Sequence, residues 1–146
     1  LTTSKFELLD YTNYPDLPVY LAVKASIAIP FVFEPVVIGN NLYCDGGICD
    51  NFPIDYAETL GNKIIGINLN QDIKDFEPNM NTLEFIYKVM FIPIQQSIRY
   101  KISRASTKCK IIQLKYDKLK FFDFNVRSQM KMEMFSSGYQ QMVEEM

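Results

Sequence analysis

The sequence predicts an α/β fold in which a layered sheet is flanked by helices. Short β-branched runs alternate along the chain with segments whose apolar residues recur at helical spacing. One run, residues 63–69, is apolar on both faces, as is typical of a strand inside a sheet. The length of 146 residues fits one domain or a piece of one. Because the chain begins with Leu1 rather than Met, we expect it to be a piece of a longer protein.

The opening segment predicts a strand followed by a helix. Residues 5–10 (KFELLD) are expected to form a short strand. Asp16 and Pro18 signal the start of a helix, so residues 17–29 are expected to be helical until Pro30 ends the helix. This helix is rich in small residues, which would let another backbone approach it closely.

The next segment predicts a hairpin and a short helix. Residues 36–38 and 42–44 are apolar runs on either side of Gly39-Asn40-Asn41, a typical hairpin signal. Residues 53–60 are expected to form a helix, which Gly61 ends at the position that glycine favours after a last turn.

The second half predicts two more strands and two more helices. Residues 63–69 form the expected interior strand, and Asn81 or Thr82 can cap a long helix that ends near Arg104 and is kinked at Pro93. A strand at 109–114 and a helix at 126–144 complete the predicted elements.

The long helix has more apolar surface than a helix with one buried face needs. Phe85, Val89 and Ile92 lie outside the stripe of apolar residues at helical spacing. This extra surface is either core or a lipid-facing patch.

The chain holds no histidine and three cysteines, which excludes several kinds of site. A Ser-His-Asp site, a Cys-His site or a His-ligated zinc cannot be assembled from this chain alone. Cys44, Cys49 and Cys109 are too few for a tetrahedral thiolate site and too unevenly spaced for a disulfide framework. We therefore predict no metal and no cofactor, and we interpret the cysteines as buried structural thiols in a reducing compartment.

Charge is distributed unevenly along a chain whose formal net charge is only −2. Residues 99–132 hold 10 basic groups against 2 acidic ones, whereas residues 1–98 hold 5 basic and 12 acidic groups. Such a basic stretch either attracts an anionic membrane surface or is a solvated helix end and hairpin. No recognised nucleic-acid motif interleaves these lysines, so nucleic acid is not predicted as a partner.

One short segment, Tyr43-Cys44-Asp45-Gly46-Gly47, places a carboxylate directly after a predicted strand. The two glycines permit positive φ and a tight change of direction. In an open α/β sheet, groups at the carboxyl ends of strands line the crevice where ligands bind. By itself, Asp-Gly-Gly is most often only a turn.

The surroundings of Asp45 carry a resemblance to a known family. Residues 21–55 (LAVKASIAIPFVFEPVVIGNNLYCDGGICDNFPID) closely resemble the patatin-like phospholipases. The family pattern is present as Ala25-Ser26, Ile29-Pro30, Phe33, Pro35, Asp45-Gly46-Gly47 and Asn51-Phe52-Pro53. Pro15-Asp16-Leu17-Pro18, Phe122-Asp123-Phe124 and Ser137-Gly138-Tyr139 are also similar to family segments. The resemblance is strongest over residues 15–55 and loose after residue 80.

The resemblance implies a patatin-like fold related to the α/β-hydrolases, with residues 1–146 as the C-terminal part of a single domain. It implies a lipid acyl hydrolase, a phospholipase A-type esterase with a Ser-Asp dyad, in which Asp45 takes the proton of the serine. Gly46 and Gly47 would leave space for the serine and a lipid carbonyl beside that carboxylate. An ordinary Asp, with a pKa near ~3.9, serves as a base only when partly desolvated, bonded to the nucleophile and aided by an oxyanion hole.

The serine half of the dyad is absent from the sequence. No pair of glycines brackets a serine as G-x-S-x-G, and the family's glycine-rich oxyanion loop is also missing. Both lie upstream of the aspartate in the family, so we expect them before Leu1. Ser26 corresponds to a residue of the small-residue helix, and we expect it to be a packing residue rather than the nucleophile.

Two classes of function therefore remain open. The first is a lipid acyl hydrolase acting on a phospholipid or another lipid ester, cytoplasmic and peripherally associated with membranes. The second is a non-catalytic lipid- or membrane-binding module, or an inactive relative of the patatins. A small-molecule-binding α/β domain is disfavoured, because neither common glycine-rich phosphate loop is present.

Overall fold

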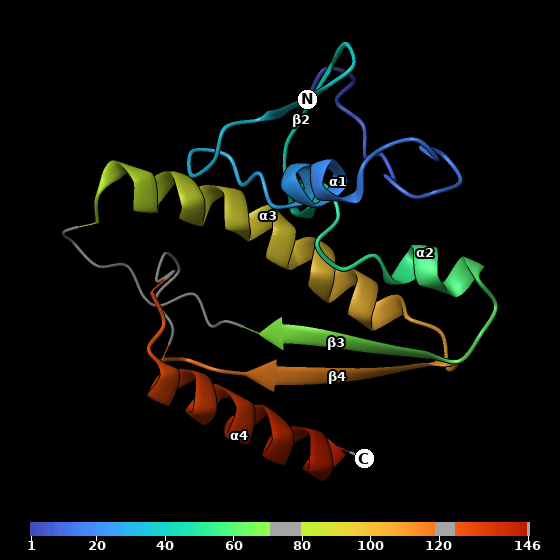
Figure 1. Ribbon diagram of the computed structural model, residues 1–146. Helices are drawn as coiled ribbons and strands as arrows, with labels where there is room; N and C mark the ends of the chain where they lie inside the picture. Colours follow the sequence, from blue (N-terminus) through green and yellow to red (C-terminus); the bar gives the residue numbers. More distant parts are fainter. Residues whose placement is uncertain (71–79, 119–124, 146) are drawn as a thin grey trace. The chain divides into compact units, whose positions relative to one another are not determined.

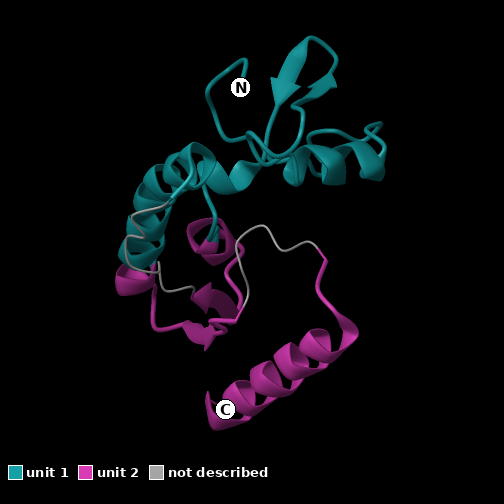
Figure 2. Cartoon of the chain, turned by 90° about the vertical axis from the view of Figure 1, so that its left-hand side faces the viewer, with its two compact units in different colours: residues 1–53, 79–101 teal, residues 54–78, 102–146 magenta. Residues whose placement is uncertain are grey.

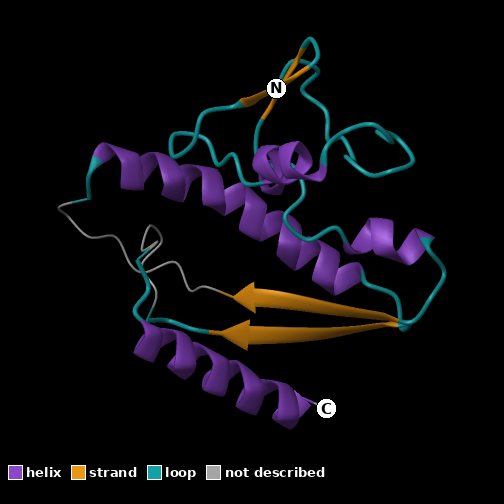
Figure 3. Cartoon of the chain, viewed as in Figure 1, coloured by secondary structure: helices purple, strands orange, loops and turns teal. Residues whose placement is uncertain are grey.

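A computed structural model describes residues 1–70, 80–118 and 125–145 and contains both helices and strands (Figures 1 and 3). Two compact units divide the chain, one of residues 1–53 and 79–101 and the other of residues 54–78 and 102–146 (Figure 2). The elements are α1 (Val19–Ser26), β1 (Val36–Ile38), β2 (Asn41–Tyr43), the 3₁₀ turn η1 (Gly46–Ile48), α2 (Ile54–Thr59), β3 (Ile64–Asn70), α3 (Thr82–Arg104), β4 (Cys109–Lys115) and α4 (Ser128–Glu145). This mixture confirms the α/β class.

The first unit is built around α1 and the hairpin. Its buried cluster consists of Ala25, Ala28 and Val36, against which Leu9 and Ile38 pack. Ala25 of α1 and Ala28, which follows the helix, therefore provide the close packing that these small residues predict.

Helix α1 ends earlier than predicted. The N–H of Ile27 still donates to the carbonyl of Val23, but the N–H of Ala28 donates to Ala25, a tighter i→i−3 bond. The chain has thus left the helix before it reaches Pro30, and the helix is confirmed with a shorter C-terminal end.

Strands β1 and β2 form the predicted antiparallel hairpin. Val36 pairs with Tyr43 and Ile38 with Asn41, so Gly39 and Asn40 make a two-residue turn. Gly39 has a φ of 60°, a conformation that favours glycine.

The strand predicted at residues 5–10 is wrong, because the structure has irregular backbone there. Ser4, just before the segment, adopts a φ of 52°, so the chain turns as it enters residue 5. At the other end of the segment, the carboxylate of Asp10 accepts the N–H groups of Thr12 and Asn13 and closes a turn. Local side-chain hydrogen bonds therefore fix a turn where the predicted strand would end.

The second unit contains a parallel pair of strands. β3 and β4 pair from Ile64 opposite Cys109 to Asn70 opposite Lys115. Helix α2 packs on β3 and α4 packs on β4. Gly61, with a φ of 75°, follows α2 as predicted.

The burial predicted for both faces of β3 is not observed. Ile65, Ile67 and Leu69 are 66%, 54% and 53% exposed. Within the described residues, β4 is the only strand that pairs with β3. The strand is therefore confirmed, whereas its position in the interior of a sheet is not.

Helix α3 begins at the predicted cap. Asn81 accepts the N–H of Glu84 over 2.9 Å, and the carboxylate of Glu84 accepts the N–H of Asn81 over 3.1 Å. This reciprocal pair is a capping box, and it satisfies backbone donors that the first turn leaves open.

Helix α3 has a buried side and an exposed apolar side. Tyr87, Gln95 and Ile98 are buried, and Pro93 lies inside the helix. The extra apolar residues Phe85, Val89 and Ile92 are each more than half exposed, so they are not core in this chain. Of the helices in the described ranges, none is both long and apolar enough to cross a membrane.

Candidate active site

Asp45 is half-buried and lies two residues after the end of β2. Its backbone N–H donates to the carbonyl of Ala28 over 2.9 Å, and its Oδ1 accepts the N–H of Gly47 over 2.7 Å. The carboxylate therefore caps η1, and its direction is fixed by the turn that follows it.

The two glycines after Asp45 play different parts. A Cβ on Gly47 would lie 2.9 Å from Oδ1 of Asp45 and 2.8 Å from Oδ1 of Asn51, closer than side chains tolerate. A Cβ on Gly46 would meet the ring of Phe6 at 3.5 Å, an ordinary contact. Neither glycine has a positive φ, so Gly47 is required for close approach rather than for an unusual backbone conformation.

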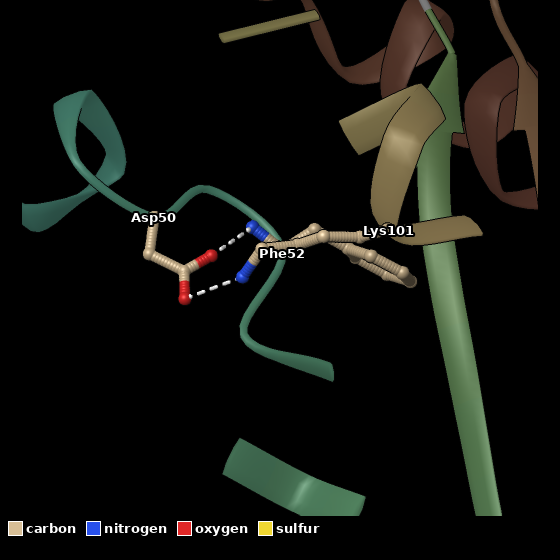
Figure 4. A network of polar contacts seen from close by, with 3 residues as sticks. All are labelled: Asp50, Phe52 and Lys101. Atoms are coloured by element: carbon tan, nitrogen blue, oxygen red, sulfur yellow. Dashed lines mark hydrogen bonds and ion pairs between the residues drawn. The ribbon is translucent and has the colours of Figure 1, made fainter. Parts of the chain in front are cut away.

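The chain after Asp45 folds into a compact turn, which we call the Asp45 turn (residues 45–52). The carbonyl of Gly46 accepts the N–H groups of Cys49 (3.0 Å) and Asp50 (2.9 Å). Asp50 then accepts the N–H of Phe52 at Oδ1 (3.2 Å) and pairs through Oδ2 with Nζ of Lys101 at 2.8 Å, as Figure 4 shows.

Tyr87 joins α3 to the segment just before the hairpin. Its hydroxyl donates to the carbonyl of Pro30 over 2.5 Å, and its side chain is buried. Burial raises the pKa of the Tyr87 hydroxyl, and the negative charge of Asp45 raises it further.

A carboxylate and two tyrosines fix the strand that leads into Asp45. Oε2 of Glu7 accepts the hydroxyls of Tyr14 and Tyr43, each over 2.7 Å. These two hydrogen bonds, that of Tyr14 first, lower the pKa of Glu7. The hydrogen bond with Tyr43, then that with Glu7, raises the pKa of Tyr14 well above its ordinary value.

The sequence did not single out Glu7, Asp50, Tyr87 or Lys101 as site residues. Tyr87 belongs to the stripe of apolar residues at helical spacing, which is typical of core, and Lys101 belongs to the basic stretch 99–132. Asp50 does carry a sequence signal. An Asp in a turn often accepts the N–H of the residue two positions later, as Asp50 does with Phe52.

The cysteines and Ser26 depart in part from expectation. All three cysteines are free thiols, with Cys44 and Cys109 half-buried and Cys49 exposed. Burial is the main cause that raises the pKa of Cys44. The prediction of a buried thiol is therefore wrong for Cys49, which follows η1 on the surface. Ser26 is exposed at the last position of α1, so its expected packing role is also wrong.

The basic stretch is partly neutralised within the chain. Besides Lys101, Nζ of Lys118 pairs with the carboxylate of Glu133 at 3.0 Å, although both side chains are exposed. Residues 119–124, including Phe122-Asp123-Phe124, lie outside the described residues. Ser137-Gly138-Tyr139 lies within α4. In the described ranges, no group of three or more acidic, cysteine or histidine side chains is arranged to hold a metal ion.

Comparison with known proteins supports the resemblance of the N-terminal segment. Residues 1–58 match the model of the family described as patatin-like phospholipase. A probable lipid hydrolase of Invertebrate iridescent virus 6 is 40% identical over 63 residues, which cover 43% of this chain and 22% of the viral protein.

Two longer matches extend over most of the chain. An uncharacterized protein, YqhO, of Bacillus subtilis is 26% identical over 139 residues, or 90% of this chain and 48% of its own length. An uncharacterized protein of Acanthamoeba polyphaga mimivirus is 28% identical over 131 residues, or 85% of this chain and 44% of its own length. The chain thus spans less than half the length of these curated relatives.

Proposed function

We propose that this chain contributes the general base, Asp45, of a lipid acyl hydrolase, because residues 1–58 match the family model described as patatin-like phospholipase. In this proposal, residues 1–146 are the C-terminal part of a single patatin-like domain with a layered sheet. In this proposal, the serine belongs to a segment of the complete protein that comes before these 146 residues. The observation that carries the proposal is the half-buried Asp45, held on a tight turn inside the family segment.

The proposed reaction is ester hydrolysis through an acyl-enzyme. The serine Oγ attacks the carbonyl carbon of a phospholipid or another lipid ester, and its proton passes to Asp45. The ester C–O bond then breaks, and the proton on Asp45 goes to the leaving alcohol. Water hydrolyses the acyl-enzyme by the same proton route, which returns both groups to their starting state.

The two oxygens of Asp45 have different surroundings in this scheme. Oδ1 accepts the N–H of Gly47, and we assign Oδ2 to the serine. Gly47 has no side chain, so its backbone can lie close to Asp45 without crowding the carboxylate. A carboxylate in a fixed direction is the arrangement that a base needs when no imidazole relays the proton.

Exposed apolar and basic side chains support a lipid surface as the partner. On α1, Val19, Tyr20 and Val23 are 77%, 69% and 52% exposed. Four basic residues of the stretch 99–132 are also exposed, namely Arg99, Lys108, Arg127 and Lys131. We propose that these residues favour an anionic membrane surface, so that the enzyme is cytoplasmic and peripherally bound.

The hydrolase function is tested by labelling the complete natural protein with a fluorophosphonate probe, which reacts with an activated serine. We expect labelling and esterase turnover in the wild type and a loss of at least about 100-fold in Asp45→Asn, because the base is removed without changing its shape. Unchanged labelling in Asp45→Asn would exclude Asp45 from the mechanism.

The second candidate is a lipid-binding module without hydrolysis, and the exposed apolar side chains Val19, Tyr20 and Val23 of α1 favour it. Its test is co-sedimentation with vesicles of anionic phospholipid at rising salt. Binding that weakens with salt, in a protein that the probe does not label, would support this candidate over the hydrolase.

A further inference from the structure

We propose that Lys101, through its ion pair with Asp50, is a positioning residue that holds the Asp45 turn in its reactive shape. The inference rests on the proposed hydrolase function, in which Asp45 is the base. It assigns a role to a lysine that lies 51 residues from its partner in the sequence and touches no reacting atom.

The ion pair is shielded from solvent. Nζ of Lys101 lies 2.8 Å from Oδ2 of Asp50, and the two side chains are only 14% and 21% exposed. A charge pair with this burial is screened less by water and salt than an exposed pair. Removing one partner also leaves the other charge poorly solvated, which destabilises the structure around that charge.

Asp50 is connected to Asp45 by short steps. The N–H of Asp50 donates to the carbonyl of Gly46 over 2.9 Å, and Gly46 directly follows Asp45. Asn51 directly follows Asp50. Its Oδ1 and Oδ1 of Asp45 lie 2.8 Å and 2.9 Å from the position that a Cβ on Gly47 would take. A shift of Asp50 would therefore move the groups that fix the direction of the Asp45 carboxylate.

The same helix holds the segment before the hairpin. Tyr87 of α3 donates to the carbonyl of Pro30, and the nearby carbonyl of Ala28 accepts the N–H of Asp45. Tyr87 and Lys101 are about 21 Å apart along the helix at the usual rise of about 1.5 Å per residue. Helix α3 thus contacts the chain on both sides of Asp45 through two polar side chains.

The test compares Lys101→Met, Lys101→Arg and Asp50→Asn with the wild type in the complete protein. Lys101→Met keeps most of the side-chain volume without the charge, and Asp50→Asn keeps the shape of the carboxylate. Lys24→Met is the matched control, because Lys24 is an exposed lysine of the same compact unit. Thermal melting checks that each variant is folded.

Two measurements are made on each variant. The first is hydrogen exchange of the amides of Cys49, Asp50 and Phe52, three of the backbone donors of the Asp45 turn. The second is kcat and KM with a short-chain, water-soluble nitrophenyl ester, so that membrane binding does not enter.

In Lys101→Met and Asp50→Asn, we expect exchange of these amides to become at least about 10-fold faster. We expect kcat to fall about 10- to 100-fold with little change in KM, since small misplacements of a catalytic group cost rates of that order. Lys101→Arg should restore most of both values, and Lys24→Met should leave both as in the wild type.

Unchanged exchange in the Asp45 turn, or a rise in KM at constant kcat, would overturn the positioning role. A wild type without esterase turnover would refute the hydrolase function and the catalytic part of this inference together. The exchange measurement would then still decide whether Lys101 holds the turn, so the two failures are distinguishable.

Discussion

Gly47 donates its backbone N–H to Oδ1 of Asp45 over 2.7 Å, and a Cβ on Gly47 would lie only 2.9 Å from the same oxygen, so a side chain there would displace it. The hydrogen bond and the close approach depend on each other, because the N–H reaches the carboxylate only if the turn comes near it. Oδ1 of Asn51 lies 2.8 Å from the position that a Cβ on Gly47 would take, so it crowds the same side of the α-carbon. The direction of the Asp45 carboxylate is therefore set by backbone geometry.

Gly47→Ala is expected to displace the Asp45 carboxylate. The added methyl would lie 2.9 Å from Oδ1 of Asp45 and 2.8 Å from Oδ1 of Asn51, so both oxygens must move. We expect esterase turnover of the complete protein to fall about 100-fold, as for other small misplacements at a reacting centre. The comparison is Gly46→Ala, whose methyl meets Phe6 at an ordinary 3.5 Å and which should lose much less. Equal losses in the two variants would contradict this assignment.

Glu7 is expected to make the stability of the fold sensitive to acid. The hydrogen bonds from Tyr14 and Tyr43 lower the pKa of Glu7 in the folded state below its ordinary value of 4.5. Its contribution is therefore fully present above about pH 4.5 and is lost as the pH falls through the lowered folded pKa.

Urea unfolding between pH 6 and pH 3 checks this expectation. The free energy of unfolding should fall with acid more steeply in the wild type than in Glu7→Gln, which cannot titrate. Glu34→Gln serves as the control, since Glu34 is an exposed carboxylate of the same unit. A wild type and a Glu7→Gln variant with parallel pH profiles would show that the Tyr–Glu contacts do not stabilise the folded state.

The capping box of α3 is expected to contribute measurably to stability. Asn81→Ala removes the oxygen that accepts the N–H of Glu84 over 2.9 Å, and we expect the free energy of unfolding to fall by about 1 kcal/mol. Asn81→Asp keeps an accepting oxygen and should lose only a small part of that. Equilibrium denaturation followed by circular dichroism measures both, and an Asn81→Ala variant as stable as the wild type would contradict the role of the cap.

Elements with strong local signals could be predicted from the sequence. Asn81 and Glu84 lie at the spacing of a capping box, and Gly39 and Gly61 take the positive φ expected of turn glycines. Each of these signals acts over a few residues, so no distant contact is needed to fix the element. The prediction for the segment 5–10 failed because the chain turns on either side of it, at Ser4 with its positive φ and at Asp10, and nothing in the local pattern predicts the positive φ of Ser4.

The site could be predicted only in part, because its supports are distant in the sequence. The motif around Asp45 indicated a functional carboxylate, but its placement as a base remains a prediction. Lys101 reaches Asp50 across 51 residues, and Glu7 reaches Tyr43 across 36. A charge pattern shows which residues are basic or acidic. Tertiary packing decides which residues they contact.

The exposed face of β3 is expected to make the 146-residue chain self-associate. Ile65, Ile67 and Leu69 lie on one face of the strand and are each more than half exposed, and paired strands with an apolar face favour further association. Light scattering at micromolar concentration should show species larger than 17.0 kDa. Replacing Ile65 and Ile67 by Thr keeps β-branched residues and should shift the chain toward monomer. A monodisperse wild-type monomer would show that this face does not drive association.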